Sequence, residues 1–465
     1  MRRFKLNIII KNAYWMISIA AITVINFSCK KFVQVGPPDT QVAAETVFEN
    51  DNTATTAVIS VYAQMGISYL DIASGGMTVY PALSADELAT TTSNTELLSF
   101  QNNAVIADNG MGIYTHLWKS AYQNIYYANA VLEGVTHSKT ITENTRNQLT
   151  GEMLVVRAIN YFWLSNLFGD IPLELSTNYR VNSVMPRAPV VEVYKQLTTD
   201  LLDAEGLLKE NYPSALKERA NKWAAAALLA RVYLYKQEWA NAEAQASMII
   251  NSTAYSLEPD LNNVFSQSSG ETIWQLGNDI SNTTEAQVFV PYSSYDVPDY
   301  VLTSFLIAAF ERGDQRFNKW VGLNTIDSTN YYYPYKYKDN NYDPVTELYI
   351  VLRLSEQYLI RAEARAEQDK VAEAIEDLNV IRSRAGLAGT IATSKSDVLM
   401  AIAHERQVEL FCEWGHRWCD LKRTGKADEI LGGEKAPNWQ ANDAVYPLPA
   451  VELVNNPFLI QNPGY

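Results

Sequence analysis

Residues 221–250 read NKWAAAALLARVYLYKQEWANAEAQASMII, which is an alanine-rich helical pattern, a break, and a second helical pattern. Residues 357–382, which read QYLIRAEARAEQDKVAEAIEDLNVIR, follow the same plan. In each stretch one alanine precedes another by twelve residues: Ala230 and Ala242, then Ala362 and Ala374. Small residues at these places let two antiparallel helices approach closely, as in tetratricopeptide-type units. The two stretches therefore predict stacked helix pairs.

Helical periodicity extends over most of the chain, and two long stretches lack it. These are residues 68–109 and residues 252–350, the second of which is rich in Tyr, Asn, Ser, Asp and Pro. Segments of this kind are usually functional or disordered. We therefore predict a mainly α fold: one helical domain over residues 46–465, with tetratricopeptide-like helix pairs and long irregular ligand-binding loops. The expected helices cover residues 51–65, 113–134, 143–168, 189–210, 217–236, 239–251, 354–368, 371–385 and 396–414.

The N-terminus has the layout of an export signal. Four basic side chains precede or enter an apolar run over residues 13–27, and the small Ser28 stands before Cys29. The run is roughly 15 residues long, shorter than the ~20 that a membrane-spanning helix needs. A cysteine at this place can be lipidated and become the new N-terminus. We expect residues 1–28 to be a lipoprotein signal peptide, Cys29 to carry the lipid and residues 29–45 to form a tether. A plain secretory signal and an uncleaved anchor are the alternatives.

Composition excludes some classes of function. Residues 1–28 carry four basic and no acidic side chains, so their removal lowers the formal net charge from −15 to −19. A surface this acidic repels nucleic acid, and no nucleic-acid partner is expected. Cys412 and Cys419 are seven residues apart, so on one helix they would lie about 10 Å apart along the axis, too far for a disulfide. A chain of this length does not need a disulfide framework.

The sequence lacks the common catalytic and cofactor motifs. It contains no G-x-x-x-x-G-K-S/T phosphate loop and no G-x-S-x-G nucleophile elbow. His404 and Glu405 begin like a zinc-protease helix, but the second histidine is missing. With four histidines in the chain, neither a histidine-rich metal site nor a cofactor is expected. The enzymatic alternative is a glycosidase with a carboxylate pair such as Asp86 and Glu87, whose required separation is spatial. The sequence therefore favours a binding protein over an enzyme.

Charged residues are interleaved with an apolar helix face close to the C-terminus. This spacing predicts partly buried groups that pair with one another and hold helices together. They are Glu405, Arg406, Glu409, Glu413 and Arg417.

Aromatic residues gather in the polar stretch over residues 252–350 rather than on a helical stripe. Flat rings can pack against the C–H faces of sugars, while hydroxyl and carboxylate groups form hydrogen bonds with sugar hydroxyls. Any single ring could instead close a loop over the core. The candidate ligand-binding residues are Tyr80, Asp86, Tyr292, Tyr295, Tyr300, Trp320, Tyr331, Tyr332 and Tyr333.

Short motifs occur in a fixed order over nearly the whole chain. They are CKKF at 29–32, RAINYF at 157–162, LFGDIP at 167–172, LRLSE at 352–356, NVIRSRAGL at 379–387, EWGHRW at 413–418 and YPLP at 446–449. In this order they resemble the SusD-like family, also called RagB/SusD. Members of that family are outer-membrane lipoproteins that partner SusC-like TonB-dependent transporters in nutrient uptake.

The resemblance implies a helical lid over a transporter barrel that captures oligosaccharides, or in some members peptides, without catalysis. By position, the ligand surface would draw on residues 69–94 and 292–335. The resemblance also implies an outer-membrane, cell-surface location. Lys30 and Lys31 replace the acidic residues often associated with surface export, so an anchor facing the periplasm stays an alternative. A structural envelope protein that binds no small ligand is a further alternative.

Overall fold

The structure is a computed structural model that describes residues 44–465 except 109 and 278–279. The chain divides into two compact units, residues 1–47 and 48–465. Of the first unit only the short helix α2 (Ala44–Val47) is described. The predicted signal peptide, the lipidated Cys29 and nearly all of the tether lie outside the described residues. Among the residues described, no helix combines the length and the apolar character needed to cross a membrane.

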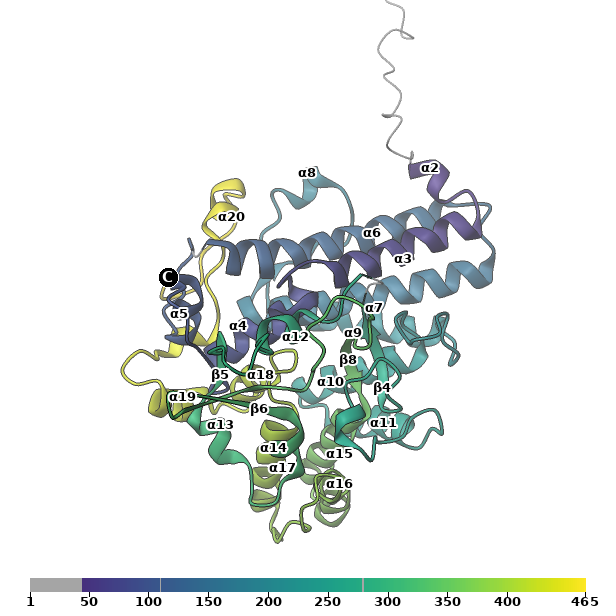
Figure 1. Cartoon of the computed structure of the whole chain (residues 1–465). Helices are drawn as coiled ribbons and strands as arrows, with labels where there is room; N and C mark the ends of the chain where they lie inside the picture. The colour runs from purple at the N-terminus through teal and green to yellow at the C-terminus, as the bar shows by residue number, and fades with distance from the viewer. Residues whose placement is uncertain (1–43, 109, 278–279) are drawn as a thin grey trace, which may run out of the picture. The chain divides into compact units, whose positions relative to one another are not determined.

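Nine helices of the second unit form the frame. Successive helices of the frame pack against one another, from α6 and α7 through α9, α10 and α11 to α15, α16 and α17 (Figure 1). Their bounds agree closely with the predicted helices, because each presents an apolar face at helical spacing. They are α3 (Asp51–Ile67), α6 (Ser120–His137), α7 (Glu143–Phe168), α9 (Val190–Leu207), α10 (Lys222–Tyr235), α11 (Trp239–Ile250), α15 (Leu354–Glu367), α16 (Val371–Arg384) and α17 (Lys395–Glu409).

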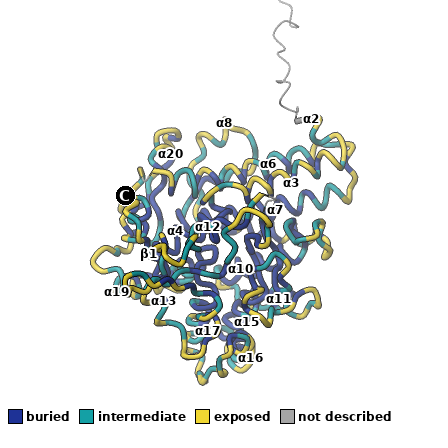
Figure 2. Tube along the Cα trace, viewed as in Figure 1, coloured by how far each residue is buried: buried dark blue, intermediate teal, exposed yellow. Residues whose placement is uncertain are grey.

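The two predicted helix pairs have the same geometry. The four alanines at twelve-residue spacing are fully buried, which confirms that small residues stand where the helices meet. Gln237 and Asp369 end the first helix of each pair with left-handed backbone, at φ values of 58° and 62°. This conformation reverses the chain within three residues. Figure 2 shows α10 and α15 as largely buried, in contrast to the peripheral α8 (Tyr179–Asn182) and α20 (Ala450–Asn455).

Buried ion pairs join neighbouring helices of the frame. In each pair an arginine donates two hydrogen bonds to one carboxylate, which is the strongest form of such a contact. The pairs, with their shortest distances, are Arg157–Asp200 between α7 and α9 (2.8 Å), Arg231–Glu356 between α10 and α15 (2.6 Å), and Arg361–Asp377 between α15 and α16 (2.6 Å).

One predicted helix ends early. The pattern over residues 396–414 gives a helix that stops at Glu409, because Cys412, Trp414 and Gly415 have left-handed backbone with φ between 46° and 66°. Cys412 and Cys419 are therefore not on one helix. Both are buried free thiols.

Short strands and short helices make up most of the rest of the second unit, including much of the two stretches predicted to be irregular. The strands form four antiparallel pairs, β1 (Leu88–Thr90) with β5 (Tyr300–Leu302), β2 (Ile171–Pro172) with β3 (Arg187–Ala188), β4 (Thr272–Leu276) with β8 (Tyr349–Arg353), and β6 (Val321–Ile326) with β7 (Thr329–Pro334). The short helices are η2 (Ile72–Gly76), α4 (Met77–Ser84), α5 (Thr95–Gln101), η3 (Gly112–Lys119), η4 (Leu261–Asn263), α12 (Thr284–Phe289), α13 (Ser304–Ala309), α14 (Gln315–Trp320), α18 (His416–Arg423), α19 (Ala427–Glu434) and η5 (Ala441–Ala444).

Candidate ligand-binding surface

Three exposed tyrosines from three distant segments lie close together. Tyr69, Tyr292 and Tyr342 are 59%, 77% and 62% exposed. The Asn340 side-chain amide donates to the Val290 carbonyl at 3.1 Å, which holds the segment of Tyr342 against the segment of Tyr292. Burial raises the pKa of Tyr69, and Asp299, Tyr292 and Tyr342 raise it further, in agreement with a position of Tyr69 near these groups. Large exposed rings that gather at one place are typical of a binding surface. We call Tyr69, Tyr292 and Tyr342 the tyrosine patch.

Strands β1 and β5 connect the part of the chain that follows Tyr69 with the part that follows Tyr292. The pair is antiparallel, with Leu88 opposite Leu302 and Thr90 opposite Tyr300. Next to it, the Thr91 backbone amide donates to the Asp299 carbonyl at 3.0 Å. The short sheet therefore holds segments that are two hundred residues apart in the sequence at a fixed register.

A buried asparagine holds the loop that carries Tyr292. Asn324, on β6, is 4% exposed, and its amide nitrogen donates to the carbonyl oxygens of Ser293 at 3.0 Å and Asp296 at 2.9 Å. These bonds fix the backbone while Tyr292 and Tyr295, the latter 87% exposed, extend into solvent. The aromatic side chains are thus presented on an ordered loop.

A second buried asparagine does the same for the loop that carries Tyr342. The amide nitrogen of Asn282 donates to the carbonyl oxygens of Asn341 at 2.8 Å and Pro344 at 3.1 Å. Its carbonyl oxygen accepts from the Thr346 backbone amide at 2.8 Å. One side chain therefore binds the backbone on both sides of Tyr342.

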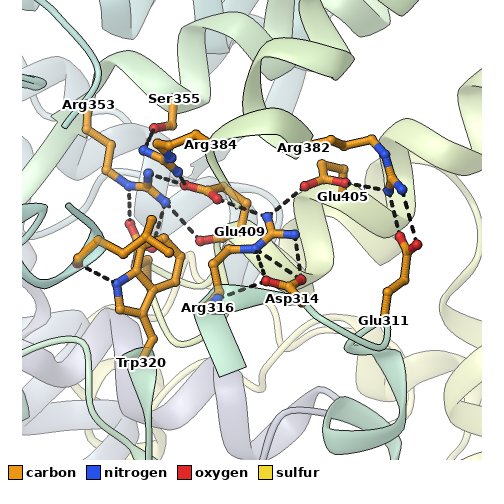
Figure 3. Close-up of polar contacts among 12 residues, drawn as sticks. Glu311, Asp314, Arg316, Trp320, Arg353, Ser355, Arg382, Arg384, Glu405 and Glu409 are labelled. Carbon is orange, nitrogen blue, oxygen red and sulfur yellow. Dashed lines mark hydrogen bonds and ion pairs between the residues drawn. The ribbon is translucent and has the colours of Figure 1, made fainter. Parts of the chain in front are cut away.

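A buried charge network fixes the hairpin β6–β7 to the frame (Figure 3). Arg316, on the helix that leads into β6, is fully buried and lies 2.7 Å from both Asp314 and Glu405 and 3.0 Å from Glu409. Trp320 follows on the same helix and donates its ring N–H to the Leu261 carbonyl at 2.8 Å.

The other end of the hairpin enters the same network. Lys336, just after β7, donates to Glu413 at 2.5 Å and to the Glu409 carbonyl at 2.8 Å. Arg353 binds Glu409 at 2.6 Å and Glu413 at 2.8 Å, and Arg384 also pairs with Glu409. Burial opposes the charge on Glu409, but the three arginines hold its pKa well below the usual range. The hairpin that supports the Tyr292 loop is thus held at both ends.

The prediction that the C-terminal charged residues are buried in ion pairs is confirmed, but the prediction that they pair with one another is wrong, because each of the five pairs with a residue outside the set. Glu405, Glu409 and Glu413 are all part of this network. Arg406 pairs with Asp420 at 2.7 Å, outside it.

Four predicted ligand-binding residues are buried, so the structure removes them from the surface. Asp86 is 1% exposed and accepts from Arg417 at 2.7 Å. Tyr80 packs on Phe100 with ring centroids 4.6 Å apart, Tyr300 packs on Phe289 at 5.6 Å, and Trp320 has no exposed surface. The three rings thus face core neighbours, and the Asp86 carboxylate faces Arg417.

The remaining predicted residues are partly or fully exposed. Tyr292 and Tyr295 stand in solvent, whereas Tyr331, Tyr332 and Tyr333 are half-buried along β7. Tyr332 packs against Phe317 and belongs to the rim of the core. The ring of Tyr333 lies directly over Gly322, where a Cβ would clash with it.

Tyr342 was not predicted from the sequence, and Tyr69 only marked the edge of a predicted loop. The segment DNNYDP at 339–344 carries a usable signal, because a lone tyrosine among Asn, Asp and Pro has no apolar periodicity to bury it. In the described part of the chain, no group of three or more His, Cys, Asp or Glu side chains is arranged to hold a metal ion.

Comparisons with known proteins agree with this architecture. Residues 48–234 match the model of a family described as starch-binding and associating with the outer membrane, and residues 318–465 match that of the SusD family. SusD-like protein P2 of Formosa agariphila is 30% identical over 78% of this chain and 83% of that protein.

Two solved structures share the fold. A SusD superfamily protein from Bacteroides vulgatus superposes with a TM-score of 0.80 at 20% identity, over 89% of this chain and 99% of that one. A laminarin-binding SusD-like protein gives a TM-score of 0.75 at 24% identity, over 90% and 100%. The mainly α fold, the order of the motifs and the extent of the match to the Formosa protein together lead to one conclusion: this chain belongs to the SusD family.

Proposed function

We propose that this protein binds a nutrient oligosaccharide at the tyrosine patch, without chemical turnover, and passes it to a SusC-like TonB-dependent transporter in the outer membrane. The observation that carries the proposal is the gathering of three exposed tyrosines on anchored loops. The family description, and a relative of known fold that binds laminarin, support a glycan as the ligand.

The patch has the chemistry that sugar binding needs. Tyrosine rings offer flat apolar faces to the C–H surface of a sugar ring, and their hydroxyls donate and accept hydrogen bonds. Because Asn282 and Asn324 already order two of the loops, binding costs less conformational entropy than it would on mobile loops.

Burial of the most plausible carboxylate pair supports a role without catalysis. Asp86 and Glu87 are each 1% exposed, and Asp86 is bound to Arg417. A general acid and a nucleophile must reach the glycosidic bond, which a buried pair cannot do without unfolding its surroundings.

The N-terminus and the family support the proposed location and the proposed partner. A lipid on Cys29 would hold the protein at the outer membrane, facing the cell surface, and residues 29–45 would let it move relative to the membrane. Co-purification of a SusC-like transporter with the full-length protein tests this part. The anchor is tested separately: Cys29→Ala should lose its association with the membrane.

Titration calorimetry with a panel of oligosaccharides from laminarin, starch and xylan tests the binding site. Tyr292→Ala and Tyr342→Ala should each weaken binding about tenfold, since one large contact ring contributes on the order of 1–2 kcal/mol. Tyr179→Ala, which removes a 71% exposed ring on α8, is the matched control and should bind normally. Binding of peptides but of no oligosaccharide would refute the glycan part. If neither class binds while the transporter still co-purifies, the protein is a structural partner instead.

A further inference from the structure

The loops of the tyrosine patch come from three long segments of the chain that lack lysine and arginine. No lysine or arginine occurs in residues 32–118, 237–311 or 339–352. Tyr69, Tyr292 and Tyr342 fall one in each of these segments. The surface that these loops form therefore has no cation of its own to offer an anionic ligand.

Carboxylates do occur there. Asp296, Asp299 and Asp343 stand next to or near the tyrosines in sequence, and all three are exposed. In the part of the chain that the structure describes, none of the three pairs with a Lys, Arg or His side chain. Their negative charge is therefore not neutralised within the protein.

The groups that act on the tyrosines are acidic as well. Besides burial, the pKa of Tyr69 is raised by Asp299 and by other tyrosines, and that of Tyr300 beneath it by Tyr69, Asp299 and Glu96. The charged neighbours of Tyr69 and Tyr300 in space are thus acidic, as are the charged residues near the tyrosines in sequence.

Basic side chains do line another surface of the protein. A hollow of about 730 Å³ between α9, the end of α10 and α18 is lined by Lys195, Lys236, Lys422 and Arg423. The absence of cations is therefore a property of the tyrosine patch and not of the whole surface.

We infer that the tyrosine patch selects uncharged oligosaccharides and excludes those that carry carboxylate or sulfate groups. This inference rests on the proposed function and names the class of ligand at the same site. Recognition of a uronate or a sulfate ester normally uses Arg or Lys in charge-assisted hydrogen bonds, which these loops cannot supply. The exposed carboxylates would also repel such a group at close range.

The test compares uncharged oligosaccharides with anionic ones. Oligosaccharides from laminarin, starch and xylan, and the same laminarin oligosaccharides oxidised at C6 to uronates, are titrated into the protein at low and at physiological salt. Alginate and polygalacturonate oligosaccharides extend the anionic set. We expect at least one uncharged ligand to bind and its oxidised form to bind about tenfold or more weakly at low salt, with a smaller difference at higher salt as screening increases.

Charge substitution supplies the second measurement. Asp299→Lys should strengthen binding of the oxidised oligosaccharide at least about fivefold and change that of the neutral one much less. Asp203→Lys makes the same charge change at an exposed position on α9 and should alter neither. Asp299 accepts through its backbone carbonyl, so this substitution leaves the contact between β1 and β5 in place.

The outcomes separate the two claims. An anionic oligosaccharide that binds as well as or better than its neutral form, and depends on Tyr292 and Tyr342, overturns the charge inference while the proposed function stands. Failure of every oligosaccharide, neutral or anionic, overturns the proposed function and this inference with it.

Discussion

Replacing Asn324 with alanine should loosen the Tyr292 loop without removing any residue that could touch a ligand. The substitution deletes the hydrogen bonds to the Ser293 and Asp296 carbonyls, at 3.0 and 2.9 Å. At about 1 kcal/mol for each bond, the ordered loop loses roughly 2 kcal/mol. Because 1.4 kcal/mol corresponds to a factor of ten, the loop opens up to about 25 times more often.

Hydrogen exchange measures this effect directly. The amides of Tyr295 and Asp296, which bond to the Ser293 side chain and carbonyl at 3.1 Å, should exchange up to about 25-fold faster in Asn324→Ala. The dissociation constant for the bound oligosaccharide should rise by the factor by which the ordered fraction of the loop falls, which is at most about 25-fold. Asn330→Ala on the same hairpin, which loses only an exposed bond to Thr325, is the control.

Two results would count against this reasoning. Unchanged exchange in Asn324→Ala would mean that other contacts order the loop. Exchange fast enough to show that the loop is mostly open, with unchanged affinity, would mean that the Tyr292 loop takes no part in binding, and the tyrosine patch would then be the wrong site.

Two further predictions concern the buried charges. Glu409→Gln leaves three buried arginines without full compensation and should cost about 3–5 kcal/mol of unfolding free energy, which for a unit of this size lowers Tm by about 4 °C in calorimetry. Because the pKa of Glu409 is depressed in the folded state, the stabilisation by its charge is present above pH ~4.3 and is lost on acidification. The melting temperatures of the variant and the wild type should therefore converge at low pH. A difference that persists there would contradict the depressed pKa of Glu409. Burial, and then Asp86, raise the pKa of Glu87 to about 8, so the folded protein retains a proton that the unfolded chain loses, and stability falls between pH ~4.3 and 8. The glutamine in Glu87→Gln can still accept a hydrogen bond from the Cys412 amide. The variant should melt at a higher temperature than the wild type at pH 8 but not at pH 5. Equal melting temperatures of the two proteins at both pH values would refute the raised pKa of Glu87.

The frame was predictable from sequence because its information is local. A helix such as α7 has an apolar period, a Thr142 cap and a Gly169 stop, all within one stretch of chain. The repeated alanine spacing likewise predicted both helix pairs. The apolar periodicity does not reveal the left-handed residues after Glu409, so the predicted helix extended beyond the true end of α17.

The ligand surface was harder to predict because it depends on contacts between distant segments. Tyr300 is buried as a member of the β1–β5 pair and Tyr80 packs on Phe100, and nothing near either residue in sequence indicates this burial. Trp320 looked like a loop aromatic because the helix that carries it is six residues long and its neighbours are polar. Tyr342 joins Tyr69 only through folding, so its neighbourhood could be found only in the structure.

The segments that present the tyrosine patch have a further property. Proteases of the trypsin type cut after lysine or arginine, and they attack exposed loops before the packed elements that the loops connect. Since residues 32–118, 237–311 and 339–352 contain neither residue, such an enzyme has no cleavage site in the three loops. Within these segments the loops that carry the candidate ligand-binding surface would therefore resist such an enzyme, whereas the frame and the segments that connect its helices contain the cleavage sites.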